Sequence, residues 1–146
     1  MKNQKKPKSL NDLIEKYPKI FKLMEEGYYR ISSDIPSIWV PIIDILCKSI
    51  QSRIDNVTIY DVEDKHHHPP QLECEQIKEK YGELRFDARG GDDQMEGMIE
   101  MAVDMCWDIC TECGTHENLG TTQVWVERLC KTCFEKSTYK NWIEDE

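Results

Sequence analysis

Two Cys-x-x-Cys pairs near the C-terminus are the feature that most constrains this chain. Cys110 and Cys113 form the first pair, Cys130 and Cys133 the second, and sixteen residues beginning with Gly114 separate them. Two residues between paired cysteines allow both sulfurs to reach one ion at about 2.3 Å, and structural zinc sites commonly use two such pairs. The pattern therefore predicts one zinc ion held by these four cysteines. Four unrelated buried thiols and a redox-active disulfide pair are the alternatives.

The predicted zinc site is closed, because protein ligands fill all four positions, and a closed site is structural rather than catalytic. Zinc would replace the hydrophobic core that a segment of about 25 residues cannot build alone. Gly114 stands where a zinc knuckle needs a positive φ angle. Residues 122–129 are expected to form a hairpin with Val124, Val126 and Leu129 on one side, and the segment after it to be helical. This order of knuckle, hairpin and helix resembles a treble clef, and a zinc ribbon with two knuckles is the alternative.

Composition and pattern divide the chain into three parts. Residues 1–8 are a lysine-rich tail expected to be disordered, residues 9–108 a core, and residues 109–146 the zinc-binding module packed on that core. The predicted fold class is α+β, with N-terminal helices on a small antiparallel sheet, then a long acidic helix, then the four-cysteine module.

Helices are predicted for the first part of the core. Ser9 is a helix N-cap with Asp12 three residues further on, and apolar residues follow at helical spacing as far as Tyr17. Pro41 suits the first turn of a second helix over residues 41–54. Its predicted buried stripe consists of Ile42, Ile45, Leu46, Ser49 and Ile50, with Cys47 buried close to it as a small hydrophobe.

Strands are expected after this helix. Asp55 and Asn56 are expected to turn the chain into a strand over residues 57–62, and a loop with three histidines follows. Tyr81-Gly82 then supplies a turn between two strands with alternating patterns. The alternating residues are Leu72, Cys74 and Gln76 in one strand and Leu84, Phe86 and Ala88 in the other.

A long acidic helix is predicted from Asp92 or Asp93 to about Asp108. Its expected inward residues are Met95, Met98, Ile99, Ala102, Met105 and Cys106. Five acidic residues spaced four apart share one face of this helix, and we call them the acidic stripe: Asp92, Glu96, Glu100, Asp104 and Asp108. Like charges at this spacing cost roughly 0.2–0.5 kcal/mol per pair. The acidic stripe is therefore either a docking face for a basic surface or a solvated face, and docking is the hypothesis that gives it a function.

Charge and hydropathy restrict the class of partner. The net charge is −9, and residues 61–146 carry nine Lys or Arg against 21 Asp or Glu. Because duplex binding needs positive charge, direct nucleic-acid binding is disfavoured and a basic protein surface is favoured. No stretch reaches the roughly 20 apolar residues that span a bilayer, and no apolar segment follows the basic N-terminus as in a signal peptide. We therefore expect a cytoplasmic protein without membrane partners.

No catalytic constellation is recognisable. The sequence has no Gly-rich phosphate loop, nucleophile elbow or His-Glu-x-x-His motif. His66, His67 and His68 could ligate a metal, but adjacent histidines in a Pro-terminated loop rarely converge on one ion. His116 could be a ligand only if one cysteine were displaced. We therefore expect a non-enzyme, and an enzyme using the histidine loop with nearby acids is the least favoured class.

Residues 77–89, IKEKYGELRFDAR, resemble a segment of the form VKEKFGGLRFY in small uncharacterised proteins of phages and bacterial genomes. In that family an acidic helix and a CxxCG pair similarly follow. Trp39, Leu46 and Cys47 also match, whereas Ile38 and Glu83 stand where the family has glycine. The resemblance covers roughly residues 10–135. It implies a phage or mobile-element origin, and hence the host cytoplasm as location.

The family-like string also contains Lys78, Lys80, Tyr81 and Arg85, which either form a small polar site or lie on the exposed face of a hairpin. A weaker likeness, limited to the finger, is to the zinc finger of RNA-polymerase-binding regulators of the DksA/TraR type. The predicted function is that of an acidic zinc-binding protein that binds a basic surface of a host nucleic-acid machine, such as a CRISPR effector or polymerase, as an inhibitor. A zinc-finger nucleic-acid-binding or transcription-regulatory protein is the alternative.

Overall fold

The first helix begins at its predicted cap. The computed structural model describes residues 5–25, 35–60 and 69–146, and all structural statements below concern these residues. In α1 (Leu10–Lys16) the Ser9 side chain accepts a hydrogen bond from the backbone N–H of Asp12 at 3.2 Å. Lys16 at the end of α1 forms a salt bridge with Asp44 of the next long helix, with Nζ 2.9 Å from Oδ1. A short helix, α2 (Lys22–Glu25), follows.

A short 3₁₀ turn, η1 (Ser37–Trp39), leads into α3 (Val40–Tyr60), which is longer than predicted. The strand predicted over residues 57–62 is wrong, because residues 57–60 continue the helix and the remainder lies outside the described residues. Asp55 and Asn56 do not turn the chain. Instead, Asp55 accepts a hydrogen bond from the side chain of Gln51 at 2.9 Å, and Asn56 donates one to the side chain of Ser52 at 3.0 Å. Each bond joins residues four apart, which lie on one face of a helix.

The buried stripe of α3 is rotated from the predicted one. Ile43, Leu46, Cys47 and Ile50 are all 4% exposed or less, whereas Ile45 is 63% exposed. The predicted burial of Cys47 is confirmed and that of Ile45 is wrong. Both stripes have helical spacing, so the sequence of the helix does not distinguish them. In the structure α3 packs on the main core with the stripe that contains Ile43 and Cys47.

Strands β1 (Glu73–Lys80) and β2 (Glu83–Arg89) form the predicted antiparallel hairpin. Tyr81 and Gly82 both have positive φ angles, 57° and 80°, as the favoured two-residue hairpin turn requires. A register shift between Cys74 and Gln76 inserts an extra residue. Because such a bulge reverses the alternation beyond it, Ile77 takes the buried position predicted for Gln76.

The long acidic helix, α4 (Asp93–Trp107), has the predicted length. Asp92 is its N-cap, since its Oδ1 accepts from the backbone N–H of Met95 at 3.0 Å. Met95 and Ala102 are buried as predicted, and so is Cys106. Met105 is 46% exposed, so its predicted inward position is wrong.

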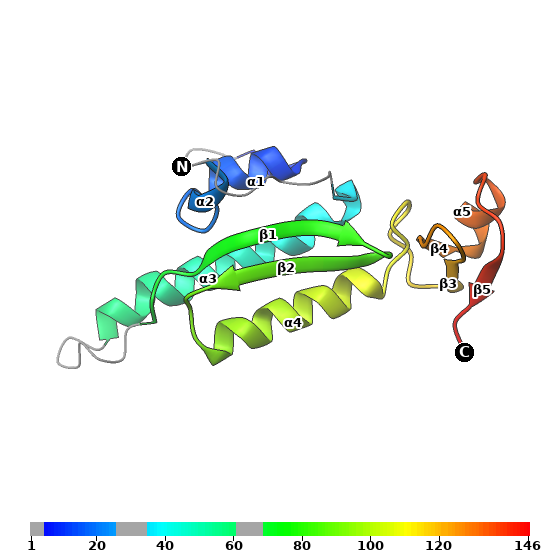
Figure 1. The fold of residues 1–146 in the computed structure, drawn as a ribbon. Coiled ribbons are helices and arrows are strands. Elements are labelled where there is room, and N and C mark those ends of the chain that lie inside the picture. Colours follow the sequence, from blue (N-terminus) through cyan, green and yellow to red (C-terminus); the bar gives the residue numbers. More distant parts are fainter. Residues whose placement is uncertain (1–4, 26–34, 61–68) are drawn as a thin grey trace.

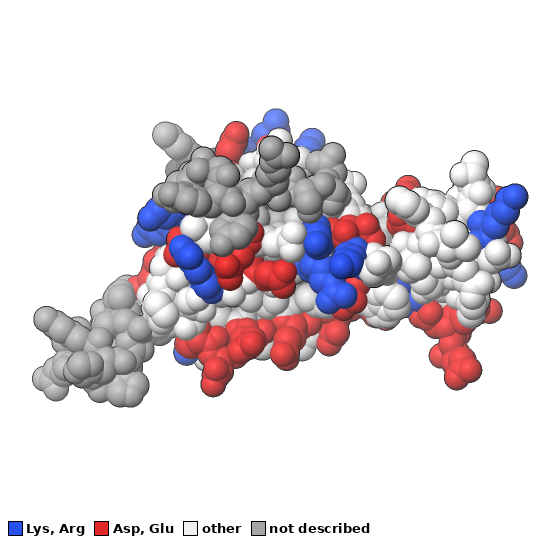
Figure 2. Space-filling view, in the orientation of Figure 1, with Lys and Arg blue, Asp and Glu red and all other residues white. Residues whose placement is uncertain are grey.

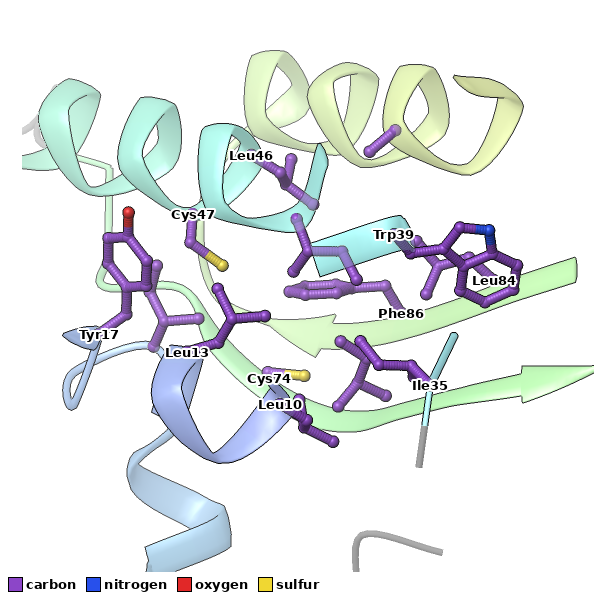
Figure 3. Packing of buried hydrophobic residues seen from close by; sticks show 14 of the residues in the cluster. Leu10, Leu13, Tyr17, Ile35, Trp39, Leu46, Cys47, Cys74, Leu84 and Phe86 are labelled. Carbon is purple, nitrogen blue, oxygen red and sulfur yellow. The ribbon is translucent and has the colours of Figure 1, made fainter. Parts of the chain in front are cut away.

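The helices and the hairpin enclose one main core. Figure 1 shows α3 and α4 running along the hairpin; α3 contacts α4, α4 contacts β2, and α2 contacts β1. Figure 3 shows the buried side chains between these elements. Phe21 packs edge-on against Phe86, with ring centroids 6.4 Å apart. Along the chain this cluster ends at Ile109, directly before the first cysteine pair.

A second, smaller cluster lies in the C-terminal part, at the right of Figure 1. The C-terminal part of the chain consists of β3 (Leu119–Thr122), β4 (Arg128–Cys130), α5 (Lys131–Glu135) and β5 (Trp142–Glu144), with strand order β4-β3-β5. The predicted hairpin is therefore displaced, and residues 123–127 connect its strands. Val124 is 98% exposed instead of packed on one side. Among the described residues, no helix is long and apolar enough to cross a membrane.

Candidate metal centre

The four predicted cysteines come together in the structure. The Sγ atoms of Cys110, Cys113, Cys130 and Cys133 all lie within 4.8 Å of one another, and those of Cys113 and Cys130 are 3.8 Å apart. Four sulfurs placed tetrahedrally at 2.3 Å around one ion would be about 3.8 Å from each other. The cluster therefore has the dimensions required to hold one metal ion.

The first pair is held by a tight turn. The backbone N–H of Gly114 donates to the carbonyl oxygen of Cys110, and the N–H of Cys110 donates to that of Thr115, both at 2.9 Å. Gly114 has the predicted positive φ angle, 77°. A Cβ atom there would lie 2.8 Å from Cγ1 of Ile38. Both backbone conformation and space thus require glycine at this position.

The second pair lies where a strand becomes a helix. Cys130 ends β4 and is the N-cap of α5, and its Sγ accepts from the backbone N–H of Cys133 at 3.4 Å. This bond orients the sulfur of Cys130 and leaves the sulfur of Cys133 one helical turn away on the same side. Backbone donors aimed at sulfur stabilise the thiolate form that binds metals.

The local environment shifts the pKa values of two of these thiols in opposite directions. Burial opposes ionisation of Cys110, but hydrogen bonds from the backbone N–H groups of Cys113, Cys130 and Glu112 lower its pKa to about 7. Burial and then the hydrogen bonds with the other three thiols raise the pKa of Cys133 far above its ordinary value. Since only a cation can stabilise four adjacent thiolates, the chemistry of this donor set fits a divalent metal.

The remaining cysteines and His116 do not belong to this cluster. Cys47, Cys74 and Cys106 are fully buried in the main core, and burial alone raises the pKa of Cys106 to about 12. Nδ1 of His116 lies 2.9 Å from the backbone oxygen of Asp108, so this histidine contacts the end of α4. The predicted loop with His66, His67 and His68 lies outside the described residues.

A buried arginine that the sequence did not single out joins the C-terminal part to α4. Arg128 is 2% exposed, and its Nε donates to the carbonyl oxygen of Trp107 at 2.7 Å. Its guanidinium stacks 4.3 Å from the Trp107 ring centroid. Its Nη1 donates to Asp145 at 2.6 Å, and Nη2 donates to the other carboxylate oxygen. The only sequence signal was a charged residue next to Leu129 in an expected strand.

We expect Arg128→Ala to lower the free energy of unfolding by roughly 3 kcal/mol, because the buried guanidinium loses its hydrogen bonds to Trp107 and Asp145 and its packing on the Trp107 ring. Arg85→Ala is the matched control: Arg85 lies on the exposed hairpin face and its 3.4 Å ion pair with Glu83 contributes less than about 1 kcal/mol. Urea denaturation of the two variants measures the difference. Equal midpoints for both would contradict the assigned role of Arg128.

The two ends of the acidic stripe have partners among the described residues, whereas its middle has none. At its first end, Asp92 accepts from Arg53 at 2.8 and 3.0 Å, and this hydrogen bond is the main reason for its lowered pKa. At its other end, Asp108 contacts His116. Glu96, Glu100 and Asp104 are exposed, and among the described residues none of them has an ion-pair partner. We call these three the central carboxylates; Figure 2 shows acidic side chains lining α4.

The family-like polar residues lie on the outer face of the hairpin. Lys78 is the register partner of Arg85, and Nζ of Lys80 lies 5.5 Å from the Tyr81 ring centroid. Figure 2 shows basic side chains gathered over this part of the hairpin. Because Lys80, Tyr81 and Arg85 are exposed, the structure places them on a surface rather than in a cleft.

No protein-family model, curated protein or solved structure matches this chain.

Proposed function

We propose that this protein is a non-enzymatic binding protein in which a structural zinc ion stabilises the C-terminal module and the central carboxylates bind a basic surface of another protein. The partner is proposed to be a nucleic-acid-handling complex of the host. The observation that carries this proposal is the exposed row of Glu96, Glu100 and Asp104, which no cation of the described residues neutralises.

Zinc is the proposed ion because four thiolates in a tetrahedral arrangement favour zinc over harder cations. The order of elements supports a treble clef: a turn at Cys110, the β3–β4 hairpin, and a helix whose N-cap is Cys130. Four protein ligands leave no coordination position for a substrate. The zinc would therefore contribute folding energy, and the function would reside on a surface.

The central carboxylates support a docking role because their arrangement is unfavourable for the isolated helix. Glu96 and Glu100, like Glu100 and Asp104, are like charges four residues apart, and each pair costs roughly 0.2–0.5 kcal/mol. A basic surface would remove this repulsion on binding and would also accelerate association. The negative balance of residues 61–146 adds to the same attraction.

The resemblance of residues 77–89 to phage and mobile-element proteins supports a host protein as the partner, for example a CRISPR effector that the chain would inhibit. The test is affinity capture from bacterial lysate with the full chain as bait, followed by mass spectrometry. We expect basic, nucleic-acid-handling proteins to be recovered and to remain bound after nuclease treatment. Recovery of nucleic acid alone would contradict the proposal.

A further inference from the structure

Next to the central carboxylates lies an apolar groove between α3 and α4. It has a volume of about 420 Å³, and every residue that lines it is uncharged. Ile45, Met101 and Met105 are 63%, 61% and 46% exposed within it. Apolar side chains that are so exposed and adjacent to each other indicate an interaction surface. We call this the methionine groove: Ile42, Ile45, Leu46, Ser49, Gln94, Gly97, Met98, Met101, Ala102 and Met105.

The groove and the carboxylates form adjacent rows on one helix. Gly97, Met101 and Met105 are spaced four apart, and each is one residue beyond a central carboxylate. Since successive residues of an α-helix are separated by about 100°, the acidic row borders the apolar row along its whole length. From Gln94 to Met105 the groove extends about 16 Å along α4, which is about three turns of a partner helix.

We propose that the methionine groove and the central carboxylates together bind a basic amphipathic helix of the partner protein. This inference rests on the proposed function and specifies which basic surface is recognised. The apolar stripe of such a helix fits a groove in the helix-in-groove mode. Its lysines and arginines would face Glu96, Glu100 and Asp104. Methionine side chains suit this role because they adapt to different apolar partners.

Two observations favour this occupant over others. A second copy of this chain would bring one acidic row against another, which like-charge repulsion opposes. Gly97 lies at an exposed position inside α4, where glycine costs about 1 kcal/mol relative to alanine. A Cβ atom there would have nothing within 4 Å, so internal packing does not require glycine. An approaching helix backbone would use the space that Gly97 leaves open.

The test uses two fluorescent peptides of about 18 residues, the length of a short amphipathic helix. One has leucines at helical spacing and lysines elsewhere, and the other has the same composition in scrambled order. We expect the full chain to bind the amphipathic peptide at least about tenfold more tightly at physiological salt. Fluorescence anisotropy measures both affinities.

Variants of uncharged groove residues measure the contribution of the groove to binding without changing the charge of the chain. Met101→Gln with Met105→Gln should weaken binding of the amphipathic peptide about tenfold and leave the scrambled peptide unaffected. Gly97→Leu adds an apolar side chain to the groove at a position where a Cβ atom has no neighbour within 4 Å, and it should have the same effect. Trp125→Gln with Ile143→Gln, at 70% and 56% exposed positions of the C-terminal module, is the matched control and should change nothing. Circular dichroism verifies that each variant is folded.

Equal affinity for both peptides would overturn the groove proposal and leave the charge-based function standing. Binding of the amphipathic peptide that survives both groove variants would overturn it too. If the wild-type chain bound neither peptide, the groove proposal and the proposed attraction to basic surfaces would both be contradicted.

Discussion

Replacing Cys110 and Cys130 by serine is expected to abolish binding of the proposed zinc ion and to unfold the C-terminal module. Apart from these cysteines, the buried apolar residues of its cluster are only Leu119 and Leu129, too few to offset the entropy of ordering the segment. Zinc-finger peptides gain about 10–16 kcal/mol from the metal. Loss of that energy should leave residues 110–146 unfolded while the main core stays folded.

Native mass spectrometry and limited proteolysis measure this outcome. The wild-type chain should carry one zinc ion, and the double variant none, with cleavage confined to the C-terminal module. Cys106→Ala is the matched control, because Cys106 is a buried cysteine of the main core outside the cluster. That variant should keep its zinc and its resistance to protease. A fully folded, protease-resistant double variant would contradict a structural role for the metal.

Reversing the central carboxylates is expected to abolish partner binding. In the variant Glu96→Lys, Glu100→Lys, Asp104→Lys, the docking face would repel a basic surface, and like-charge contacts across an interface cost several kcal/mol. All three side chains are exposed, so α4 should keep its helicity and thermal stability. Affinity capture should then recover none of the proteins bound by the wild-type chain.

The control variant for this charge reversal has the same change in net charge, made at three positions outside α4. Glu117, Glu135 and Glu144 are exposed residues of the C-terminal module, and replacing all three by lysine should leave capture unchanged. Raising the salt concentration should weaken wild-type binding, because exposed charges are screened over about 10 Å at 0.1 M. If both triple variants captured the same proteins as the wild type, the acidic face would not be the docking site.

Local chemistry made several elements predictable from the sequence. The caps at Ser9 and Asp92, the Tyr81-Gly82 turn and the positive φ angle at Gly114 each depend on a few neighbouring residues. The cysteine cluster was predictable for a related reason, since the spacing of the pairs reflects the geometry of one ion.

Features set by tertiary packing were not predictable. Ile45 and Met105 fit a helical stripe as well as their buried neighbours do, and only the docking of α3 and α4 leaves them exposed. The bulge after Cys74 makes Ile77 buried in place of Gln76, which the simple alternation of the strand had placed on the same face as Cys74. A buried arginine such as Arg128 is recognisable only once Trp107 and Asp145 are seen around it.

The placement of the partner on α4 is tested most directly by NMR of the chain with ¹³C-labelled methionine methyl groups. Met101 and Met105 are exposed in the groove, whereas Met95 is fully buried and Met24 packs on the main core from α2. Adding the amphipathic basic peptide should shift the Met101 and Met105 signals and leave those of Met24 and Met95 in place. If the peptide bound but the Met101 and Met105 signals did not change, docking in the methionine groove would be contradicted.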